Sequence, residues 1–456
     1  MAKTEETKMD KIISLAKRKG FVFQGSEIYG GLAGTWDFGP YGVALRNNIK
    51  SLWWKKFVTD REDMYGIDAA ILMNQEVWKA SGHVGGFSDP LIGCDGCGSS
   101  WRTDQLLENQ PDEDGEYACL ACKNLLGTKE EILKKTKKFN MMFQTHIGAS
   151  NDSSSISYLR PETAQGMFVN FKNVVDSFHP TLPFGLAQIG KAFRNEIAPR
   201  DFVFRSREFE QMEIEYFVDP RDAKKVQATF EELYGEQINF LKELGLSSEK
   251  IHKIEVPDGD RAHYSKRSVD TEFDFPFGQK ELLGIAYRTD FDLKAHTDAS
   301  KVDLSYFDEE TKERFIPHCI EPTFGVDRLM LAVLSDAYTE DEVDGEKRVY
   351  LKLSPKIAPV KVAVFPLLKN KPQLVEKARE IFMMLKKEIP GVMFDDNGNI
   401  GKRYRRQDEI GTPFCVTIDF DTVEKGSGVT VRERDSGRQE RIEIEKLAAY
   451  IKEKIS

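Results

Sequence analysis

The chain has 456 residues, of which 40% are hydrophobic and 11% aromatic, which suits ordinary globular cores and a length of about three domains. Charged residues make up 31% and the net charge is −10, which argues against a surface devoted to nucleic-acid phosphates but allows a local basic patch. Met1–Lys19 lacks the apolar core of a secretory signal, and no run approaches the roughly 18 apolar residues of a membrane span, so we expect a cytoplasmic protein without a membrane partner.

The first 60 residues predict two helices separated by a glycine-rich stretch, Gly25–Gly42. Gly39-Pro40 is a start signal for the second helix, since proline is well tolerated in a first helical turn. Residues spaced by one and two helical turns then give this helix one apolar face, formed by Leu45, Ile49, Leu52 and Trp53.

Residues 90–140 have the character of an insertion that carries two tight cysteine pairs, Cys94-x-x-Cys97 and Cys119-x-x-Cys122. Four thiolates match the tetrahedral coordination of zinc, and in a chain without a secretory signal they indicate a metal site rather than disulfides. Because all four ligands are cysteine, no coordination position stays open, and we expect the zinc to be structural. Cys319 and Cys415 stand alone and are predicted to be buried thiols.

Residues 155–217 are predicted to be rich in strands, and their most informative stretch is Phe193–Glu213. Because successive strand residues face opposite ways, Met212, Ile214 and Tyr216 lie on one face. The other face presents a cation, an aromatic ring, an amide and a carboxylate, namely Arg207, Phe209, Gln211 and Glu213. Such groups can hold phosphate, stack on a base and bind an amine, although a hairpin with cross-strand ion pairs would show the same pattern.

A turn at Arg160–Gly166 would place Glu162 where it can meet an ammonium group, unless Glu162 only pairs with Arg160. His83 and His146 have no serine or cysteine nucleophile in a suitable context, so we interpret them as structural histidines.

The segment Glu321–Arg328 predicts a strand that passes into a helix over residues 321–337. Gly325 lets the backbone approach a ligand and Arg328 can hold a phosphate at the helix start, with a surface pair between Asp327 and Arg328 as the alternative. The sequence contains neither a Walker phosphate loop nor a dinucleotide fingerprint, so any ATP must bind at these arginine-rich segments.

A helix is predicted after Asp219-Pro220, and strands are predicted around Phe273–Asp292. The acidic stretch Glu340–Glu346 and the prolines after it predict a linker over residues 338–359. Beyond the linker, strands and helices alternate, which indicates a small α/β domain. Within that domain four cations surround Tyr404 and could bind phosphate beside a stacked base, or form a solvated cationic turn.

Together these segments resemble the class II aminoacyl-tRNA synthetases, and specifically the homodimeric glycyl-tRNA synthetases, over essentially the whole chain. Gly39–Gly42 with its helix resembles motif 1, which builds the dimer interface, Phe193–Glu213 resembles motif 2, and Gly325–Arg328 resembles motif 3. The longer strings that separate the glycine enzymes from their histidine, threonine and proline relatives are Arg160–Gly166, Arg205–Glu213 and Gly401–Gly411.

The resemblance implies an α+β fold with an antiparallel-sheet catalytic core over residues 1–357, a zinc-ribbon insertion at 90–140 and a helical insertion at 219–265. An α/β anticodon-binding domain would follow at 358–456. The implied activity is ATP-dependent ligation of glycine to its tRNA through glycyl-adenylate, by a homodimer that uses Mg²⁺ and a structural Zn²⁺. The alternatives are a class II synthetase of another amino-acid specificity and a non-catalytic nucleic-acid-binding paralogue, which the retention of Arg194, Glu196, Phe209 and Arg328 disfavours.

The resemblance also implies roles for single residues. Arg194 and Arg328 would be catalytic, with Arg194 on the α-phosphate, and Arg205 and Arg328 on the outer phosphates. Glu196 would read adenine and Phe209 would stack on it. The implied ATP site is Arg194, Asn195, Glu196, Phe204, Arg205, Ser206, Arg207, Glu208, Phe209, Glu281, Leu282, Gly325, Val326, Asp327 and Arg328.

The implied glycine site is Arg102, Glu162, Phe209, Glu210, Gln211, Met212, Glu213, Arg288, Glu321, Pro322, Thr323, Phe324 and Gly325. Members of the family often have serine where Thr323 stands and alanine where Phe324 stands. The implied anticodon contacts are Lys402, Arg403, Tyr404, Arg405 and Arg406, and the implied zinc ligands are Cys94, Cys97, Cys119 and Cys122.

Overall fold

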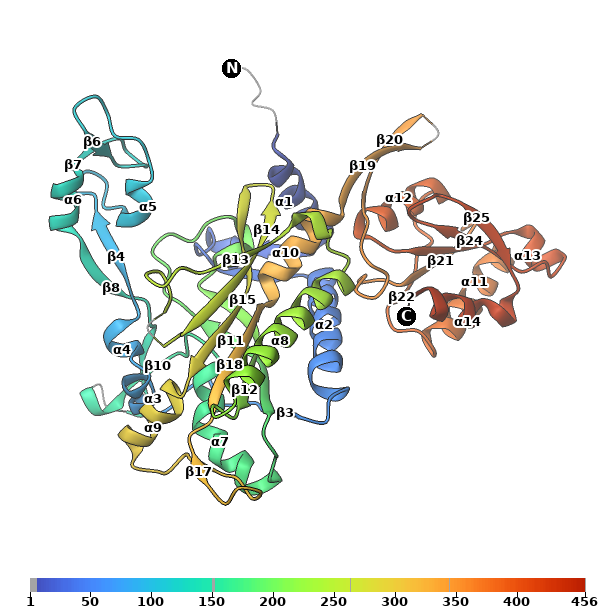
Figure 1. Cartoon of the computed structure of the whole chain (residues 1–456). Coiled ribbons are helices and arrows are strands. Elements are labelled where there is room, and N and C mark those ends of the chain that lie inside the picture. Colours follow the sequence, from blue (N-terminus) through green and yellow to red (C-terminus); the bar gives the residue numbers. More distant parts are fainter. Residues whose placement is uncertain (1–5, 150–151, 263, 344, 456) are drawn as a thin grey trace.

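A seven-stranded sheet forms the centre of the computed structural model, which describes residues 6–149, 152–262, 264–343 and 345–455 (Figure 1). Neighbouring strands are antiparallel except for the parallel pair of β11 and β3 at one edge. In hydrogen-bonded order the strands are β13 (Ile251–Glu255), β14 (Arg267–Phe275), β15 (Gly278–Thr289), β18 (His318–Gly325), β12 (Glu208–Val218), β11 (Phe184–Phe193) and β3 (Met64–Gly66).

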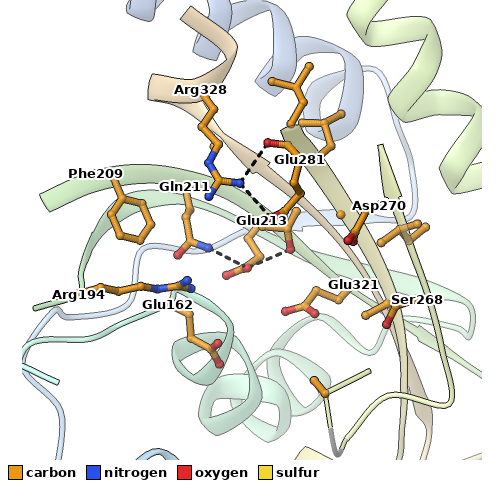
Figure 2. Close-up of a pocket in the computed structure, with 18 of the residues that line it drawn as sticks. Glu162, Arg194, Phe209, Gln211, Glu213, Ser268, Asp270, Glu281, Glu321 and Arg328 are labelled. Atoms are coloured by element: carbon orange, nitrogen blue, oxygen red, sulfur yellow. Dashed lines mark hydrogen bonds and ion pairs between the residues drawn. The ribbon is translucent and has the colours of Figure 1, made fainter. Parts of the chain in front are cut away.

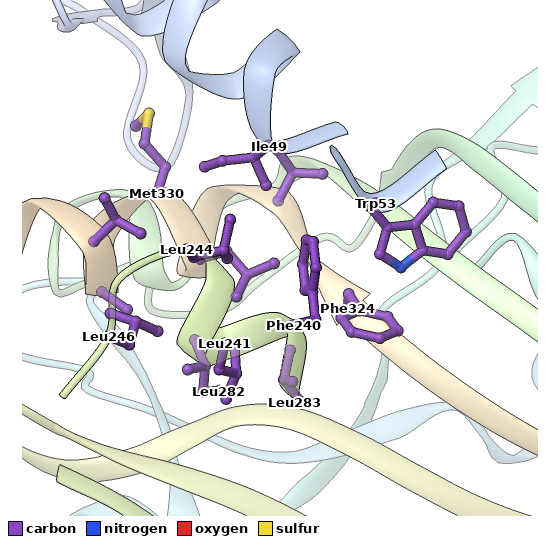
Figure 3. Close-up of a cluster of buried hydrophobic side chains, with 14 of the residues drawn as sticks. Ile49, Trp53, Phe240, Leu241, Leu244, Leu246, Leu282, Leu283, Phe324 and Met330 are labelled. Carbon is purple, nitrogen blue, oxygen red and sulfur yellow. The ribbon is translucent and has the colours of Figure 1, made fainter. Parts of the chain in front are cut away.

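Three helices pack on one face of this sheet and form the main hydrophobic core: α2 (Pro40–Trp54), α8 (Ala223–Glu243) and α10 (Val326–Ala337). Figure 3 shows the ring of Phe240 of α8 beside that of Phe324, with Trp53 of α2 next to Phe324 and Ile49 of α2 above Phe240. The predicted second helix is confirmed, with Gly39 as its N-cap and proline in its first turn.

The opposite face of the sheet is covered by α7 (Ala164–Phe178) and α9 (Phe291–Ser300). The prediction that residues 155–217 are mainly strands was wrong at α7, where Met167, Phe168 and Phe171 repeat at helical spacing and are all buried. Neighbouring positions of β12 confirm the two faces, because Phe217 packs in the α7 cluster while Tyr216 and Val218 pack in the main core.

The cysteine-bearing insertion projects from one side of the core in Figure 1, on the two arms β4 (Ser88–Gly93) and β8 (Lys137–Asn140). Its own small core gathers Ile92, Leu106, Leu126 and Ile132. The remaining elements of the insertion are β5 (Ser100–Arg102), α5 (Thr103–Leu107), β6 (Glu116–Ala118), β7 (Leu125–Thr128) and α6 (Lys129–Lys135).

Two other segments differ from their predicted form. Residues 219–265, expected as a helical insertion, contain α8 but also β13, which completes an edge of the central sheet. The predicted linker at 338–359 contains a hairpin, β19 (Tyr338–Val343) and β20 (Glu346–Leu351), so its acidic residues extend a strand instead of a coil. The first segment differs because β13 pairs with β14, and the second because its acidic residues pair with the following strand, so strand pairing decided both structures.

The C-terminal domain is the predicted α/β unit, built on a five-stranded sheet within the described residues. Its strands, in hydrogen-bonded order, are β22 (Val392–Phe394), β21 (Val362–Pro366), β23 (Phe414–Ile418), β24 (Val429–Glu433) and β25 (Gln439–Ile442). Its helices are α11 (Pro372–Lys386), α12 (Ile400–Ile410), α13 (Phe420–Glu424) and α14 (Ile444–Ile455). The cations around Tyr404 lie on α12 and not on a turn.

Among the described residues, no helix is both long and apolar enough to cross a membrane.

Short elements connect these units. The short elements are α1 (Lys8–Lys19), β1 (Val22–Gln24), β2 (Trp36–Phe38), α3 (Gln75–Ala80), α4 (His83–Gly86), β9 (Gln144–His146), β10 (Ile156–Tyr158), β16 (Tyr306–Phe307) and β17 (Arg314–Phe315).

Candidate active site

A pocket of about 360 Å³ opens on the α7 face of the central sheet, where β12, β18, β15 and β14 run side by side (Figure 2). The register places Gln211 opposite Gly325 and Glu213 opposite Thr323, so alternate residues of both strands line it. The predicted strand periodicity is thereby confirmed for Phe209, Gln211 and Glu213, whereas Arg207 precedes β12 and does not line the pocket.

The pocket brings together most of the predicted nucleotide and amino-acid ligands. The lining residues from the implied ATP site are Arg194, Glu196, Phe204, Arg205, Ser206, Phe209, Glu281, Leu282, Gly325, Asp327 and Arg328. Those from the implied glycine site are Glu162, Phe209, Glu210, Gln211, Glu213, Glu321, Thr323 and Gly325.

Other predicted residues lie outside the lining. Met212, Phe324 and Val326 are buried in the main core, because strand alternation turns the first two away from the pocket. Arg207 donates to the carbonyls of Ala33 and Glu196. The rest of this group is Asn195, Glu208, Arg102, Arg288 and Pro322, of which Arg288 supports a lining carboxylate.

Arg194 lies at one wall of the pocket, at the end of β11. Its Nε donates to the carbonyl of Pro161 at 3.1 Å, and its guanidinium lies 5.4 Å from the ring of Phe209 and 5.3 Å from that of Phe87. One hydrogen bond and two rings fix the side chain, which leaves donors for an anion in the pocket.

Arg205 and Arg328 form a second cationic wall. The Nη1 atom of Arg205 is buried without a hydrogen-bond partner among the described residues, and burial with nearby arginines lowers the pKa of this side chain. Arg328 reaches the Glu281 carboxylate at 3.2 Å and lies 4.5 Å from the ring of Phe204. A guanidinium group with unused hydrogen-bond donors in a pocket can bind a multiply charged anion.

Asp327 does not form the alternative surface pair with Arg328. It is buried, 2.9 Å from Arg46 of α2, and accepts from the backbone N–H of Glu210 at 3.2 Å. These bonds join α10, α2 and β12, so Asp327 holds the wall together instead of meeting a ligand through its charge.

The other end of the pocket is acidic. Glu213 accepts from the backbone N–H of Thr163 at 3.1 Å, from its hydroxyl at 2.5 Å, from Gln211 at 3.2 Å and from Thr323 at 3.1 Å. Burial and the charge of Glu162 raise the pKa of Glu213 in spite of these bonds. The Thr323 hydroxyl thus has a defined partner.

Glu162 contacts His83, whose Nε2 lies 3.4 Å from its carboxylate, and accepts from Gln165 at 3.0 Å. Burial opposes its ionisation, but His83 and Arg288 outweigh burial and hold the pKa of Glu162 below its usual value. His83 is therefore a neighbour of the pocket as well as a buried histidine bonded to Ser81 at 2.8 Å. The alternative pairing of Glu162 with Arg160 does not form, since Arg160 donates to the carbonyls of Lys191 and Ala69.

Glu321 completes the acidic end and receives Arg288 at 2.9 Å. Arg288 also binds both oxygens of Asp292 at 2.7 Å, and Tyr264 covers its guanidinium with the ring centroid 3.9 Å away. Burial raises the pKa of Glu321 to about 8 although Arg288 opposes this. Carboxylates outnumber cations here, which favours a ligand with an ammonium group.

The lining residues that sequence reasoning missed include three with polar side chains, Tyr264, Ser268 and Asp270. Burial and the charges of Glu281 and Glu272 raise the pKa of Asp270 to about 6. Ser268 and Asp270 alternate on β14, opposite Ala286 and Gly284, so strand periodicity could have found them once β14 was paired with β15. Tyr264 precedes that strand and carries no local pattern.

The four cysteines of the insertion meet in one cluster, with their sulfur atoms within 4.8 Å of one another. Cys94 and Cys122 are 3.6 Å apart, and Cys97 and Cys119 are 3.7 Å apart. Zinc–sulfur bonds of about 2.3 Å in a tetrahedron place sulfur atoms roughly 3.8 Å apart, so the donor set fits Zn²⁺. Cys319 and Cys415 are buried, as predicted.

The predicted anticodon residues lie on helix α12 and differ in how far they are exposed. Arg403 is buried and donates to the carbonyls of Pro366, Asp396 and Gly398. Tyr404 bonds to Thr417 at 2.6 Å inside the domain, whereas Lys402 is exposed and Arg406 is partly exposed beside Asp395. Internal bonds therefore occupy Arg403 and Tyr404, for which the sequence had predicted RNA contacts.

Comparisons with known proteins agree with this geometry. Residues 145–337 match the family described as tRNA synthetase class II core domain (G, H, P, S and T), and residues 361–454 match the family described as anticodon binding domain. A glycine–tRNA ligase from Caldanaerobacter subterraneus subsp. tengcongensis is 50% identical, with 98% of each chain covered. Glycine–tRNA ligases from Clostridium acetobutylicum and Bacillus thuringiensis subsp. konkukian are 49% and 47% identical, with at least 98% of each chain covered.

Proposed function

The chain belongs to the class II glycine–tRNA ligases, and from this premise we propose how its pocket activates glycine with ATP and passes it to tRNA. The observation that carries the proposal is the division of one pocket into a cationic wall, with Arg194, Arg205 and Arg328, and a buried acidic end, with Glu162, Glu213 and Glu321. A triphosphate suits the first and an amino group suits the second. Because ATP and tRNA would be its substrates, we propose that the protein is located in the cytoplasm.

In our proposal Arg194 holds the α-phosphate, while Arg205 and Arg328 hold the outer phosphates. Phe209 and Glu196 receive adenine, since both line the pocket next to Arg194. Asp270 and Glu281 would hold Mg²⁺, because their carboxylates are near enough to raise the pKa of Asp270. The ion would offset phosphate charge when bound.

Glycine would place its ammonium group among Glu162, Glu213 and Glu321, with its carboxylate directed towards Arg194. The acid end is lined by bonded carboxylates and Thr323, which leave little room for a larger side chain. The carboxylate of glycine would then attack the α-phosphate of ATP and displace pyrophosphate without a protein nucleophile, so the protein supplies positioning and charge stabilisation. This accounts for the abundance of arginine and glutamate in the pocket.

The C-terminal domain, residues 358–456, would bind the anticodon of the tRNA. Lys402, Arg405 and Arg406 are the cations of α12 that remain at least partly exposed, and we assign them to phosphate contacts. The insertion at 90–140 would hold structural Zn²⁺ on its four cysteines.

We also propose a homodimer built around the loop before α2. Ile28 is 89% exposed and Tyr29 is 87% exposed, with Leu32 and Val43 also exposed on the same segment. Large apolar side chains grouped on a surface favour burial against a second copy.

ATP–pyrophosphate exchange across a panel of amino acids tests the function. Exchange with glycine alone is expected, exchange with another amino acid would indicate a sister specificity, and no exchange would indicate a non-catalytic paralogue. Arg194→Ala should lower glycine-dependent exchange by about 100-fold or more, because it removes a charge-stabilising donor. Arg221→Ala, in an exposed cluster with Asp219 and Asp308, is the matched control, and near-normal exchange in Arg194→Ala would contradict the assigned role.

A further inference from the structure

The acidic end of the pocket contains more buried carboxylates than its cations can balance. Five are buried: Glu162, Glu213, Glu215, Asp292 and Glu321. Arg288 is already shared between Asp292 and Glu321, and Arg160 faces Glu213 while it donates to backbone carbonyls. Like charges in a dry interior repel strongly, so the empty pocket is expected to retain protons on some of these groups.

The neighbours of this cluster come from every element packed around it. They are Arg194 on the pocket wall, His83 at the start of α4, Tyr264 before β14, His296 on α9 and Cys319 on β18. His83 is engaged with Glu162, and His296 with Gln165 at 2.8 Å. Neither is placed to neutralise Glu215.

Among the described residues Glu215 has no ion pair, and Glu321 has only Arg288, which it shares with Asp292. One carboxylate oxygen of Glu215, one of Glu321 and one of Glu213 lie within 4.8 Å of one another. Glu215 is fully buried, accepts from the thiol of Cys319 at 2.9 Å, and has an Oε1 atom without a hydrogen-bond partner among the described residues. Glu321 lines the pocket, whereas Glu215 lies beneath it. Burial and Glu321 raise the pKa of Glu215 well above its usual value.

On the premise of the proposed function, we propose that Glu215 and Glu321 each hold a proton in the empty pocket and that the ammonium group of glycine displaces the proton of Glu321. Glycine enters as a zwitterion, the O–H bond of Glu321 breaks, and one proton leaves to solvent. The resulting carboxylate pairs with the ammonium group, so the charge of the acidic end is unchanged, and the glycine carboxylate brings one negative charge to the cationic wall at Arg194. Glu215 keeps its proton throughout and serves as a neutral group beneath the site.

This exchange makes glycine binding depend on pH in a defined direction. Burial raises the pKa of Glu321 to about 8, so below that pH glycine must expel a proton in order to bind. The apparent affinity should rise by about tenfold per pH unit between pH 6 and 7 and level off above the pKa. The KM for glycine in exchange should fall over the same range while the KM for ATP follows a different profile.

Calorimetric titration of the full-length enzyme with glycine at pH 7, in two buffers of different ionisation enthalpy, counts the released protons. We expect about one proton per glycine. Glu215→Gln mimics the protonated acid and should keep both the release and the affinity within about threefold. Glu321→Gln should bind glycine more weakly and release none.

Binding of glycine without proton release at pH 7 would overturn the inference and leave the proposed function intact. Loss of release in Glu215→Gln would overturn the assignment of a permanently neutral Glu215. If the wild-type protein neither binds glycine nor supports exchange with it, the proposed function fails instead, so the two failures are distinguishable.

Discussion

At the scale of single residues, the pocket is arranged before a substrate binds, because its carboxylates already have fixed donors. Glu213 is the clearest case, since the backbone and hydroxyl of Thr163, the amide of Gln211 and the hydroxyl of Thr323 all donate to it. Groups fixed in this way need no reorganisation as charge develops, which is the largest electrostatic contribution in many enzymes.

Thr323 therefore provides a test of this arrangement. Thr323→Val removes one donor and leaves an oxygen of buried Glu213 without that bond, at a cost of about 1–2 kcal/mol. We expect a rise of about tenfold in the KM for glycine and little change in the KM for ATP, measured by pyrophosphate exchange. Thr323→Ser keeps the hydroxyl and is the matched control; equal effects of the two variants would show that the methyl group matters instead.

At the scale of elements, one face of β18 lines the pocket and its other face packs in the main core. Phe324 lies among the rings of Phe57, Phe240 and Trp53 at centroid distances of 5.2, 5.7 and 5.8 Å. The ring is thus part of the packing between α2, α8 and the sheet, and the expectation that it shapes the glycine pocket directly was wrong.

Phe324→Ala should lower the free energy of unfolding by about 3–5 kcal/mol, because it empties a fully buried site between three elements. Denaturant unfolding followed by tryptophan fluorescence measures this, since Trp53 is a direct neighbour. Val423→Ala, at a half-exposed position, should change stability by less than about 1 kcal/mol. A similarly small change for Phe324→Ala would mean that the cavity closes by repacking.

The insertion is an element whose stability should depend on its metal. Its core of Ile92, Leu106, Leu126 and Ile132 is small, so the zinc cross-link must supply much of its stability. Metal analysis should find about one zinc per chain. Cys97→Ser should reduce that ratio and expose the insertion to limited proteolysis, whereas Cys415→Ser should not; a protease-resistant insertion without metal would contradict this.

Local pattern predicted those parts of the fold and site that depend on neighbouring residues. The alternation from Phe209 to Glu213 correctly predicted the pocket face of β12, and the cysteine spacing predicted a cluster with zinc geometry. Asp270 and Tyr264 escaped prediction because their relation to the pocket arises from strand pairing and a loop. The same cause hid the bonds of Arg403, which are made to distant carbonyls.

At the scale of the whole molecule, the C-terminal domain is docked on the catalytic core through a buried ion pair. Arg348 of β20 lies 3.5 Å from Asp408 of α12 and donates to the carbonyl of Arg434 at 2.8 Å. Asp408 also receives Arg432 at 2.8 Å. A second contact comes from Asn48 of α2, which donates to the carbonyls of Ile357 and Ala358 at 3.0 Å. The helix with the predicted tRNA cations is thereby tied to the core.

Asp408→Ala should uncouple the two steps of the reaction. It leaves the buried guanidinium groups of Arg348 and Arg432 without their shared partner, at a cost of about 3 kcal/mol or more to the docking. Glycine-dependent exchange should persist, because the residues that line the pocket all come from the catalytic core, whereas aminoacylation of tRNA should fall by about tenfold or more as the domain loses its orientation. Asp421→Ala, which loses an exposed pair with Lys425, is the control. A parallel fall of both activities would show that the pair supports the core itself, and unchanged aminoacylation would show that the domain needs no fixed docking.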